Sequence, residues 1–427
     1  MTLPWETGPR SSSRTVVVGA GVIGLACAYS LRKRGGDVIV LDKGEPGGAC
    51  SKGNVGWITP SISAPIPAPG LTLDSLKWML HSDSPLYISP MAAPRLARWL
   101  WRFWRYCNKR DFVHGLRALA ELNRRTFSAF SELERDGVQF ELHRSGLLCV
   151  FHDESYMERA RAEFTHYRDY GYQVPTPLSG ADLRRLEPAL SDAVTAGFMV
   201  EEEFHTRPET LVAGYLKSLR EMGVEIRSGV QVTGGNGAQS SGQVRGVDTS
   251  AGLVEGDQVL VAAGAWSGQL LEHFGVSLPV QAGKGYSLTL TGIEPRLGRP
   301  VYLGEARVGG SPFDGATRFA GTMELSGVNE TLDRRRIAGI RAGIRRYLRQ
   351  PIEKGEGVEW VGMRPLTPDG LPMLGRVPGY QNLLVATGHA MLGITLAPVT
   401  GEVMADIMTG TASAATLAPF DPGRFRW

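Results

Sequence analysis

The chain has few cysteines, little net charge and no long apolar run, and each shortage excludes a class of protein. Its 427 residues include 4 cysteines at scattered positions, which excludes a disulfide-stapled scaffold and a Cys-x-x-Cys metal site. No apolar run approaches the ~20 residues that a membrane-spanning helix needs. The 46 lysines and arginines nearly balance the 43 aspartates and glutamates, so nothing in the charge favours a nucleic-acid partner.

The sequence has instead the composition of an ordered, loop-rich globular protein. Hydrophobic residues make up 42%, with 54 glycines and 26 prolines. A chain of this length is expected to form two or three structural units. The first 13 residues lack the apolar stretch of a secretory signal. We therefore expect a soluble, cytoplasmic protein that at most binds peripherally to the inner face of the cell membrane.

The chain opens, after this polar leader, with a β-α-β pattern. Residues 15–18 read as a buried strand, residues 25–34 as a helix and residues 37–42 as a second buried strand. The sequence Gly-Ala-Gly-Val-Ile-Gly joins the first strand to the helix at residues 19–24. This is the context that a dinucleotide-binding fingerprint requires.

Each glycine of that loop has a separate physical role. Gly19 permits the tight turn, Gly21 lets a pyrophosphate approach the backbone, and Gly24 lets the helix pack on the strand. Asp42 ends the second strand, where its carboxylate can accept hydrogen bonds from a ribose and would repel a 2′-phosphate. The fingerprint does not separate NAD from FAD, and a similar glycine turn can occur without a ligand.

The remaining chain alternates helical and strand-rich blocks. Helices are expected over residues 73–135, strands return after residue 137, and a second strand-rich block follows residue 223. Residues 333–349 read as a basic helix. Residues 395–408 read as the last long helix, with Pro398 in its first turn.

Two later strands also end in glycines, at residues 259–266 and 383–389. In a doubly wound sheet, such strand ends border the ligand crevice. The second strand leads into the last helix, whose start carries unpaired amides and a partial positive charge. That charge would stabilise a reduced flavin, which is negative near N1 and the C2 carbonyl.

Together these segments resemble the FAD-dependent D-amino-acid oxidase superfamily, and most closely the bacterial D-amino-acid dehydrogenases, over about residues 15–408. The departure is Ala390, where members of the family often carry glycine. The most specific similarities are the residue 19–24 loop and the segments 51–60, 68–70, 76–79, 284–287, 362–365, 367–372, 388–389 and 392–393.

The resemblance implies an α/β fold with two domains. The first is a Rossmann-like FAD-binding domain with a sheet of the glutathione-reductase type. The second is a substrate-binding domain built on a mixed or antiparallel sheet plus helices. The FAD-binding domain would comprise residues 14–75, 195–278 and 358–427, and the substrate-binding domain residues 76–194 and 279–357.

The resemblance also implies a noncovalent FAD and no metal ion. The residues expected to hold the pyrophosphate and ribose are Gly19, Ala20, Gly21, Val22, Ile23, Gly24, Asp42 and Lys43. Those expected near the ribityl chain, the ring and the adenine are Ser51, Asn54, Val55, Gly56, Val232, Ala263, Gly264 and Trp266. Those expected at the pyrimidine end are Gly388, His389, Leu392, Gly393, Ile394 and Thr395.

For the substrate, the family assigns the arginine of the Gly-x-Arg-Pro segment, here Arg364, to the carboxylate. A guanidinium matches a carboxylate in a bidentate geometry. Trp57 and Tyr286 are expected to line the substrate pocket, whereas Tyr302 is expected to be structural. The implied reaction is hydride transfer from the Cα of a D-amino acid, such as D-proline or hydroxyproline, to flavin N5. The imine would hydrolyse to a 2-oxo acid and ammonia, with electrons passing to a quinone or another acceptor.

Two alternatives stay open at this point: a glycine- or sarcosine-type oxidase that produces hydrogen peroxide, and a non-catalytic dinucleotide-binding protein. Residues 95–106 mix aromatics and arginines at helical spacing. This pattern fits either a membrane-surface helix or a helix with its indoles in the core.

Overall fold

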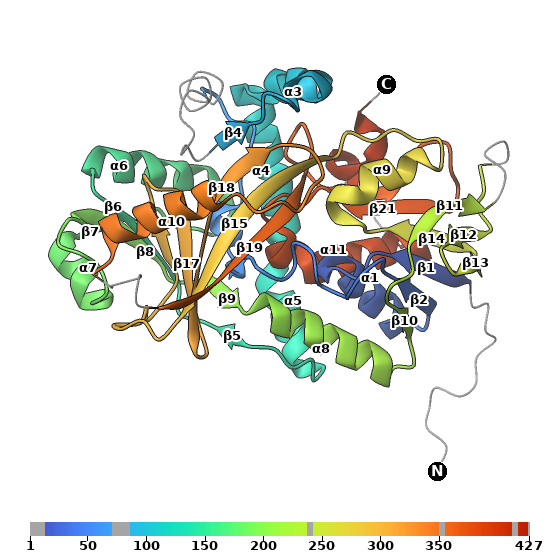
Figure 1. Cartoon of the computed structure of the whole chain (residues 1–427), viewed down its shortest axis with the longest axis horizontal. Helices are drawn as coiled ribbons and strands as arrows, with labels where there is room; N and C mark the ends of the chain where they lie inside the picture. The colour runs from blue at the N-terminus through green and yellow to red at the C-terminus, as the bar shows by residue number, and fades with distance from the viewer. Residues whose placement is uncertain (1–12, 71–85, 237–241, 350–354, 412–416, 426–427) are drawn as a thin grey trace, which may run out of the picture.

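The computed structural model describes residues 13–70, 86–236, 242–349, 355–411 and 417–425. Two large sheets lie side by side in it, one built around the N-terminal strand and the other from the middle of the chain (Figure 1). The resembling segment at residues 76–79 and the start of the expected helical block lie outside the described residues.

The first sheet has six strands and is parallel except for β20 at its edge. β1 lies at its centre because its valines are buried on both faces, as a parallel strand requires. In sheet order the strands are β10 (Glu225–Arg227), β2 (Asp37–Leu41), β1 (Arg14–Val18), β14 (Gln258–Val261), β21 (Leu383–Thr387) and β20 (Met373–Arg376).

Helices and a small sheet cover the two faces of this sheet. Three helices pack together on one face: α1 (Val22–Lys33), α8 (Pro208–Glu221) and α11 (Gly393–Thr409). The other face carries α9 (Ser267–Glu272) and an antiparallel sheet of β11 (Val232–Asn236), β12 (Gly246–Thr249) and β13 (Gly252–Glu255). The predicted Rossmann-like fold of this part of the chain is confirmed.

The second sheet has nine strands of mixed direction. Its main path is β19 (Glu356–Leu366), β15 (Gln281–Thr291), β18 (Ala316–Leu325), β17 (Val308–Phe313), β16 (Val301–Leu303), β6 (Leu147–Phe151), β8 (Ala196–Val200) and β7 (Pro177–Ser179), with β4 (Leu86–Ile88) beside β18. The helix α10 (Arg334–Tyr347) covers one face, and α6 (Glu154–Glu163) packs on β6 and β8 at the other.

Two strands of this sheet begin near the predicted domain boundaries. The FAD-binding domain was expected to resume at residues 195 and 358. β8 and β19, which begin at Ala196 and Glu356, pair within the nine-stranded sheet, β8 with β6 and β7 and β19 with β15.

Four further helices are α3 (Ala93–Tyr106), α4 (Lys109–Asn123), α5 (Thr126–Arg135) and α7 (Gly180–Leu186), of which α4 and α5 pack against α11. A small sheet joins β3 (Trp57–Ile58), β9 (Phe204–Thr206) and β5 (Leu142–His143). No helix of the described residues is long and apolar enough to span a membrane.

The last helix differs from its prediction. α11 begins at Gly393, so Pro398 lies inside the helix rather than in its first turn. A proline there has no N–H to donate to the carbonyl of Ile394.

Candidate functional site

A single cavity of about 1490 Å³ runs between the two sheets. Ligand pockets usually measure about 300–1,000 Å³, so this cavity has room for a large cofactor and a second molecule. Most residues predicted to bind the cofactor line it: Gly19, Gly21, Val22, Ile23, Asp42, Lys43, Ser51, Asn54, Val55, Gly56, Val232, Ala263, Gly264, Trp266, His389, Leu392, Gly393 and Ile394. Arg364, Tyr286 and Trp57 border the same cavity.

The glycine loop forms a cradle in which Gly19 and Gly24 have no space for a side chain. At Gly19, where φ is +110°, a Cβ would lie 2.5 Å from the carbonyl oxygen of Ala262. At Gly24, a Cβ would lie 1.9 Å from the carbonyl oxygen of Gly19. Gly21 precedes the first residue of α1 and borders the cavity. The start of α1 therefore presents backbone amides to the cavity, where an anion is favoured.

Asp42 and Ser51 fix this loop. Asp42 accepts hydrogen bonds from the backbone N–H groups of Ala20 at 2.7 Å and Gly44 at 2.8 Å, one at each carboxylate oxygen. Ser51 Oγ accepts from the N–H of Val22 at 3.0 Å. Each carboxylate oxygen of Asp42 keeps a lone pair for a ribose hydroxyl.

Four predicted cofactor residues, Ala20, Gly24, Gly388 and Thr395, do not border the cavity but support it. Gly388 has φ of +83°, and Thr395 Oγ1 donates to the carbonyl of Trp57 at 2.9 Å. His389 is buried, and its Nε2 lies 3.0 Å from Thr400 Oγ1. Burial lowers the pKa of His389 to about 3, so its imidazole is neutral at pH 7.

Ala390 occupies a position where the sequence departs from the pattern it resembles. Its φ is +48°, in the left-handed region that glycine enters without steric cost. Its N–H donates to the carbonyl of Pro365 at 2.9 Å, so the conformation is fixed beside the segment that carries Arg364.

Replacing Ala390 with glycine should therefore stabilise the protein. Holding alanine in this conformation destabilises the folded state by about 1–2 kcal/mol, which glycine would avoid. Glycine also makes the unfolded chain more flexible, which offsets about 0.4–1 kcal/mol of this gain. We expect a net gain of about 0.5–1 kcal/mol in thermal unfolding. Ala397→Gly, within α11, should destabilise the protein. Equal losses in both variants would contradict the assignment of strain to residue 390.

Arg364 extends from β19 into the cavity over Gly285 of β15. A Cβ at Gly285 would lie 2.2 Å from the Arg364 guanidinium. Nη1 of Arg364 donates to the carbonyl of Thr322 at 3.0 Å. Burial lowers the pKa of Arg364 to about 10, which leaves it protonated at pH 7. Among the described residues no carboxylate forms an ion pair with it.

Thr322 owes its position to an irregularity in the sheet. The register between β15 and β18 shifts between Lys284 and Tyr286, and Thr322 takes φ of +62° in this bulge. Such a φ is uncommon for a β-branched residue. The bulge places the Thr322 carbonyl against Arg364, a feature that the sequence did not signal.

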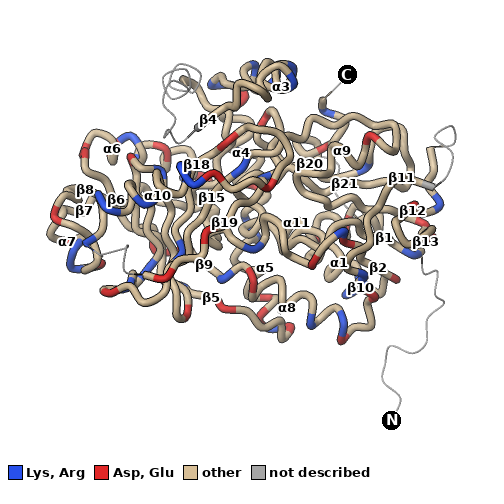
Figure 2. The backbone as a smooth tube through the Cα atoms, viewed as in Figure 1, with Lys and Arg blue, Asp and Glu red and all other residues tan. Residues whose placement is uncertain are grey.

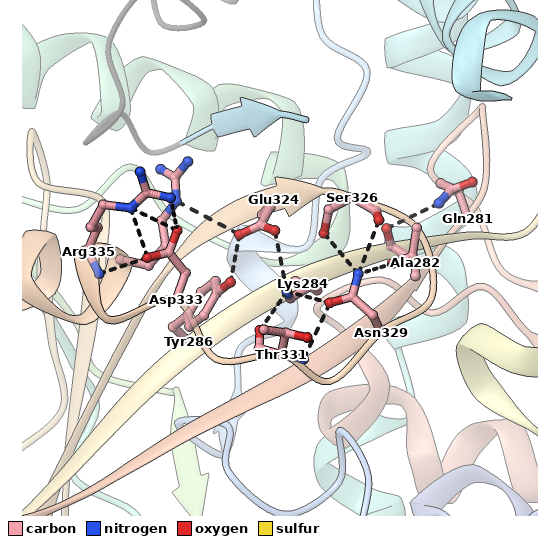
Figure 3. A network of polar contacts seen from close by, with 12 residues as sticks. Gln281, Ala282, Lys284, Tyr286, Glu324, Ser326, Asn329, Thr331, Asp333 and Arg335 are labelled. Carbon is pink, nitrogen blue, oxygen red and sulfur yellow. Dashed lines mark hydrogen bonds and ion pairs between the residues drawn. The ribbon is translucent and has the colours of Figure 1, made fainter. Parts of the chain in front are cut away.

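Tyr286 borders the cavity, but its hydroxyl is bound on the opposite side. Its side chain is fully buried in the core beneath α10, and its hydroxyl donates to Glu324 at 2.6 Å. Glu324 also pairs with Lys284, whose Nζ lies 3.3 Å away (Figure 3). Successive side chains of a strand alternate between its faces, so Tyr286 points away from the face that Gly285 leaves open to Arg364. The structure gives no support to a direct substrate contact by its hydroxyl.

Trp57 lies as expected, and two aromatic residues join it. Trp57 Nε1 donates to Ser311 Oγ at 2.9 Å, and its ring packs over Gly309. Tyr302, expected to be structural, also borders the cavity, with its ring centroid 6.2 Å from that of Trp57. Trp360, which the sequence analysis did not single out, covers the cavity wall at Gly53.

A buried carboxylate stands behind the cavity wall. Glu203 accepts a hydrogen bond from the N–H of Ser61 at 3.0 Å, and burial raises its pKa to about 8. In the unfolded chain its pKa is about 4.3. Between these values the unfolded state has lost a proton that the folded state keeps, so stability falls as pH rises through this window.

Glu203→Gln should remove the loss of folding stability that Glu203 causes as pH rises. We expect the variant to match the parent at pH 5 and to be more stable at pH 8.5, by on the order of a few kcal/mol. Denaturant titrations at both pH values measure this, with the exposed neighbour Glu202→Gln as the control. A variant that gains nothing at pH 8.5 would contradict a neutral Glu203.

Comparison with known proteins agrees with this geometry. A model of the family described as "FAD dependent oxidoreductase" matches residues 14–407. The chain belongs to this family. The cofactor of the site is therefore FAD, and the glycine cradle, the start of α1 and Asp42 are the residues that fit its pyrophosphate and ribose.

Solved structures share the whole fold at low sequence identity. Glycine oxidase from Bacillus cereus ATCC 14579 is 22% identical, with a TM-score of 0.72, over 95% of this chain and 97% of that one. L-proline dehydrogenase from P. horikoshii is 17% identical, with a TM-score of 0.76, over 97% and 98%. An L-amino acid deaminase from Proteus vulgaris is 20% identical, with a TM-score of 0.69, over 98% and 96%.

Proposed function

We propose that this protein is an FAD-dependent dehydrogenase of D-amino acids. Its substrate would lose two electrons and two protons at the C–N bond, and water would convert the imine into a 2-oxo acid and ammonia. Bound FAD supplies the two-electron oxidation. The electrons would then pass to a quinone or a similar acceptor.

The observation that carries the proposal is Arg364. It is a protonated guanidinium in a partly dry cavity, anchored by one nitrogen to the Thr322 carbonyl and without a carboxylate among the described residues. A substrate carboxylate would satisfy it and would be held in a fixed orientation. The similar structures named glycine oxidase, L-proline dehydrogenase and L-amino acid deaminase support an amino-acid substrate. The D preference rests on the sequence resemblance.

Anaerobic mixing with pairs of D- and L-amino acids tests this proposal. We expect D-enantiomers to bleach the flavin absorbance band and L-enantiomers to leave this band unchanged. In air, little hydrogen peroxide should form without an added quinone. Rapid, stoichiometric peroxide from glycine or sarcosine would favour the oxidase alternative, and bleaching by L-amino acids alone would overturn the enantiomer preference.

A membrane-bound acceptor is consistent with α3. Trp99 is buried and donates to the carbonyl of Pro279, but Trp101 and Trp104 are 54% and 58% exposed. Residues 93–110 contain six arginines and lysines and no acidic residue. The helix α3, which carries most of this basic stretch, lies at the top of the view in Figure 2. Trp104 also borders the cavity. We propose that α3 rests on an anionic membrane at the mouth of the site.

Vesicle flotation tests this contact. Protein should float with vesicles that contain phosphatidylglycerol and not with pure phosphatidylcholine. Replacing both Trp101 and Trp104 with serine should lower binding at least about tenfold, since each buried indole contributes ~1.5–3 kcal/mol. Leu253→Ser, an exposed apolar residue on β13, is the control. Unchanged flotation of the double variant would contradict the proposal that α3 contacts the membrane.

A further inference from the structure

The cavity has a second polar end, across the large sheet from Arg364. The Arg364 guanidinium lies at β18, because it bonds the Thr322 carbonyl. From there the cavity continues past Gly309 on β17 and Tyr302 on β16. It reaches β6 and the end of α6, where Glu163 borders it.

Polar groups gather at this end. Glu163, Arg307 and Tyr302 all border the cavity. Tyr302 borders the cavity with its ring edge-on to that of Trp57. Glu163 is exposed to solvent on one side. Partial desolvation by the protein on its other side raises its pKa, and Arg307 opposes this with a smaller effect. A carboxylate in that setting is stabilised by further positive charge.

The wall of the cavity around this end is otherwise apolar. Its side chains come from β6, β8 and the turn after α6: Cys149, Phe151, Phe198 and Phe164. Such a wall suits a chain of methylene groups and offers them no hydrogen bonds.

The separation of the two ends sets the length of the ligand. From β18 to β6 the path crosses three strand spacings, which is about 14 Å at ~4.8 Å each. An extended lysine or arginine, with a hydrogen bond of about 2.9 Å at each end, spans a distance of this order. A small cyclic amino acid does not.

We propose that the end formed by Glu163 and Tyr302 is a subsite for the cationic group of a basic amino acid. Arg364 would hold the carboxylate, the apolar wall would contact the methylenes, and Glu163 would accept hydrogen bonds from the ammonium or guanidinium. This inference rests on the proposed function and specifies its substrate class.

The test compares each basic amino acid with a neutral one of similar shape. For the enantiomer that the enzyme accepts, kcat/KM for lysine should exceed that for norleucine by about 10–100-fold, the contribution of a charged hydrogen bond. Arginine should exceed citrulline likewise. Glu163→Gln should lower kcat/KM for lysine about tenfold or more and leave norleucine within about twofold.

Glu154→Gln, on the same helix but outside the cavity, is the matched control and should change neither substrate. If norleucine is oxidised as well as lysine and Glu163→Gln leaves their ratio unchanged, the subsite is overturned while the proposed function stands. If no amino acid of either enantiomer reduces the flavin, the proposed function and the subsite both fail.

Discussion

Gly24→Ala is expected to yield a protein that retains no FAD. The new methyl group would lie 1.9 Å from the carbonyl oxygen of Gly19 and 3.4 Å from Cβ of Ala262, so α1 could not stay against β1. Neither neighbour can yield, because one is backbone and the other belongs to the buried sheet. The flavin absorbance of the purified protein measures the loss.

Gly21→Ala separates loss of the cofactor from loss of the fold. There the methyl group would meet only Ser51 Oγ, at 3.4 Å, so the loop can fold, but the methyl group would take space in the cradle. We expect a folded protein whose Kd for FAD rises about tenfold or more. Gly234→Ala, on β11 with no contact shorter than 3.9 Å, is the control. An unchanged Kd in Gly21→Ala would contradict the assignment of this loop to the pyrophosphate.

The second large effect is expected at Arg364. Arg364→Ala should keep FAD and lower kcat/KM by about 10²–10³-fold, since an unpaired carboxylate in a partly dry site costs roughly 2–5 kcal/mol. Gly285→Ala should act in the same direction, because its methyl group would displace the guanidinium.

Arg376→Ala provides the comparison, since Arg376 is exposed on β20 and does not border the cavity. Steady-state kinetics with the best amino acid measure all three variants. If the Arg364→Ala enzyme kept the parental kcat/KM, residues other than Arg364 would have to bind the substrate carboxylate.

The glycine cradle was predictable from the sequence because its determinants are local. The positive φ of Gly19 and the contact of Gly24 with the Gly19 carbonyl arise within one strand-turn-helix unit, whereas the contact of Gly19 with Ala262 comes from a distant strand end. The position of Arg364 came from the resemblance, and the reason that it fits, the bare backbone of Gly285, became visible only with the register of β15 against β19.

The features of the site that the sequence did not predict have a common physical origin in long-range pairing. The direction of Tyr286 depends on which face of β15 meets α10, and the placement of Thr322 depends on a bulge opposite that strand. Tyr302 and Trp360 became part of the cavity wall through contacts with Trp57 and Gly53, which lie far away in the sequence. Residue patterns within a single strand carry no information about such partners.

The central claim is that a flavin and an acid group held by Arg364 meet in one cavity. The most direct measurement is the absorbance of the holoenzyme during anaerobic titration with single amino acids, for the parent and for Arg364→Ala. Both proteins should be yellow from bound FAD. A suitable amino acid should bleach the parent protein at low concentration, and Arg364→Ala should require a far higher concentration of the same amino acid. Equal bleaching curves for the two proteins, or a flavin that no amino acid reduces, would contradict it.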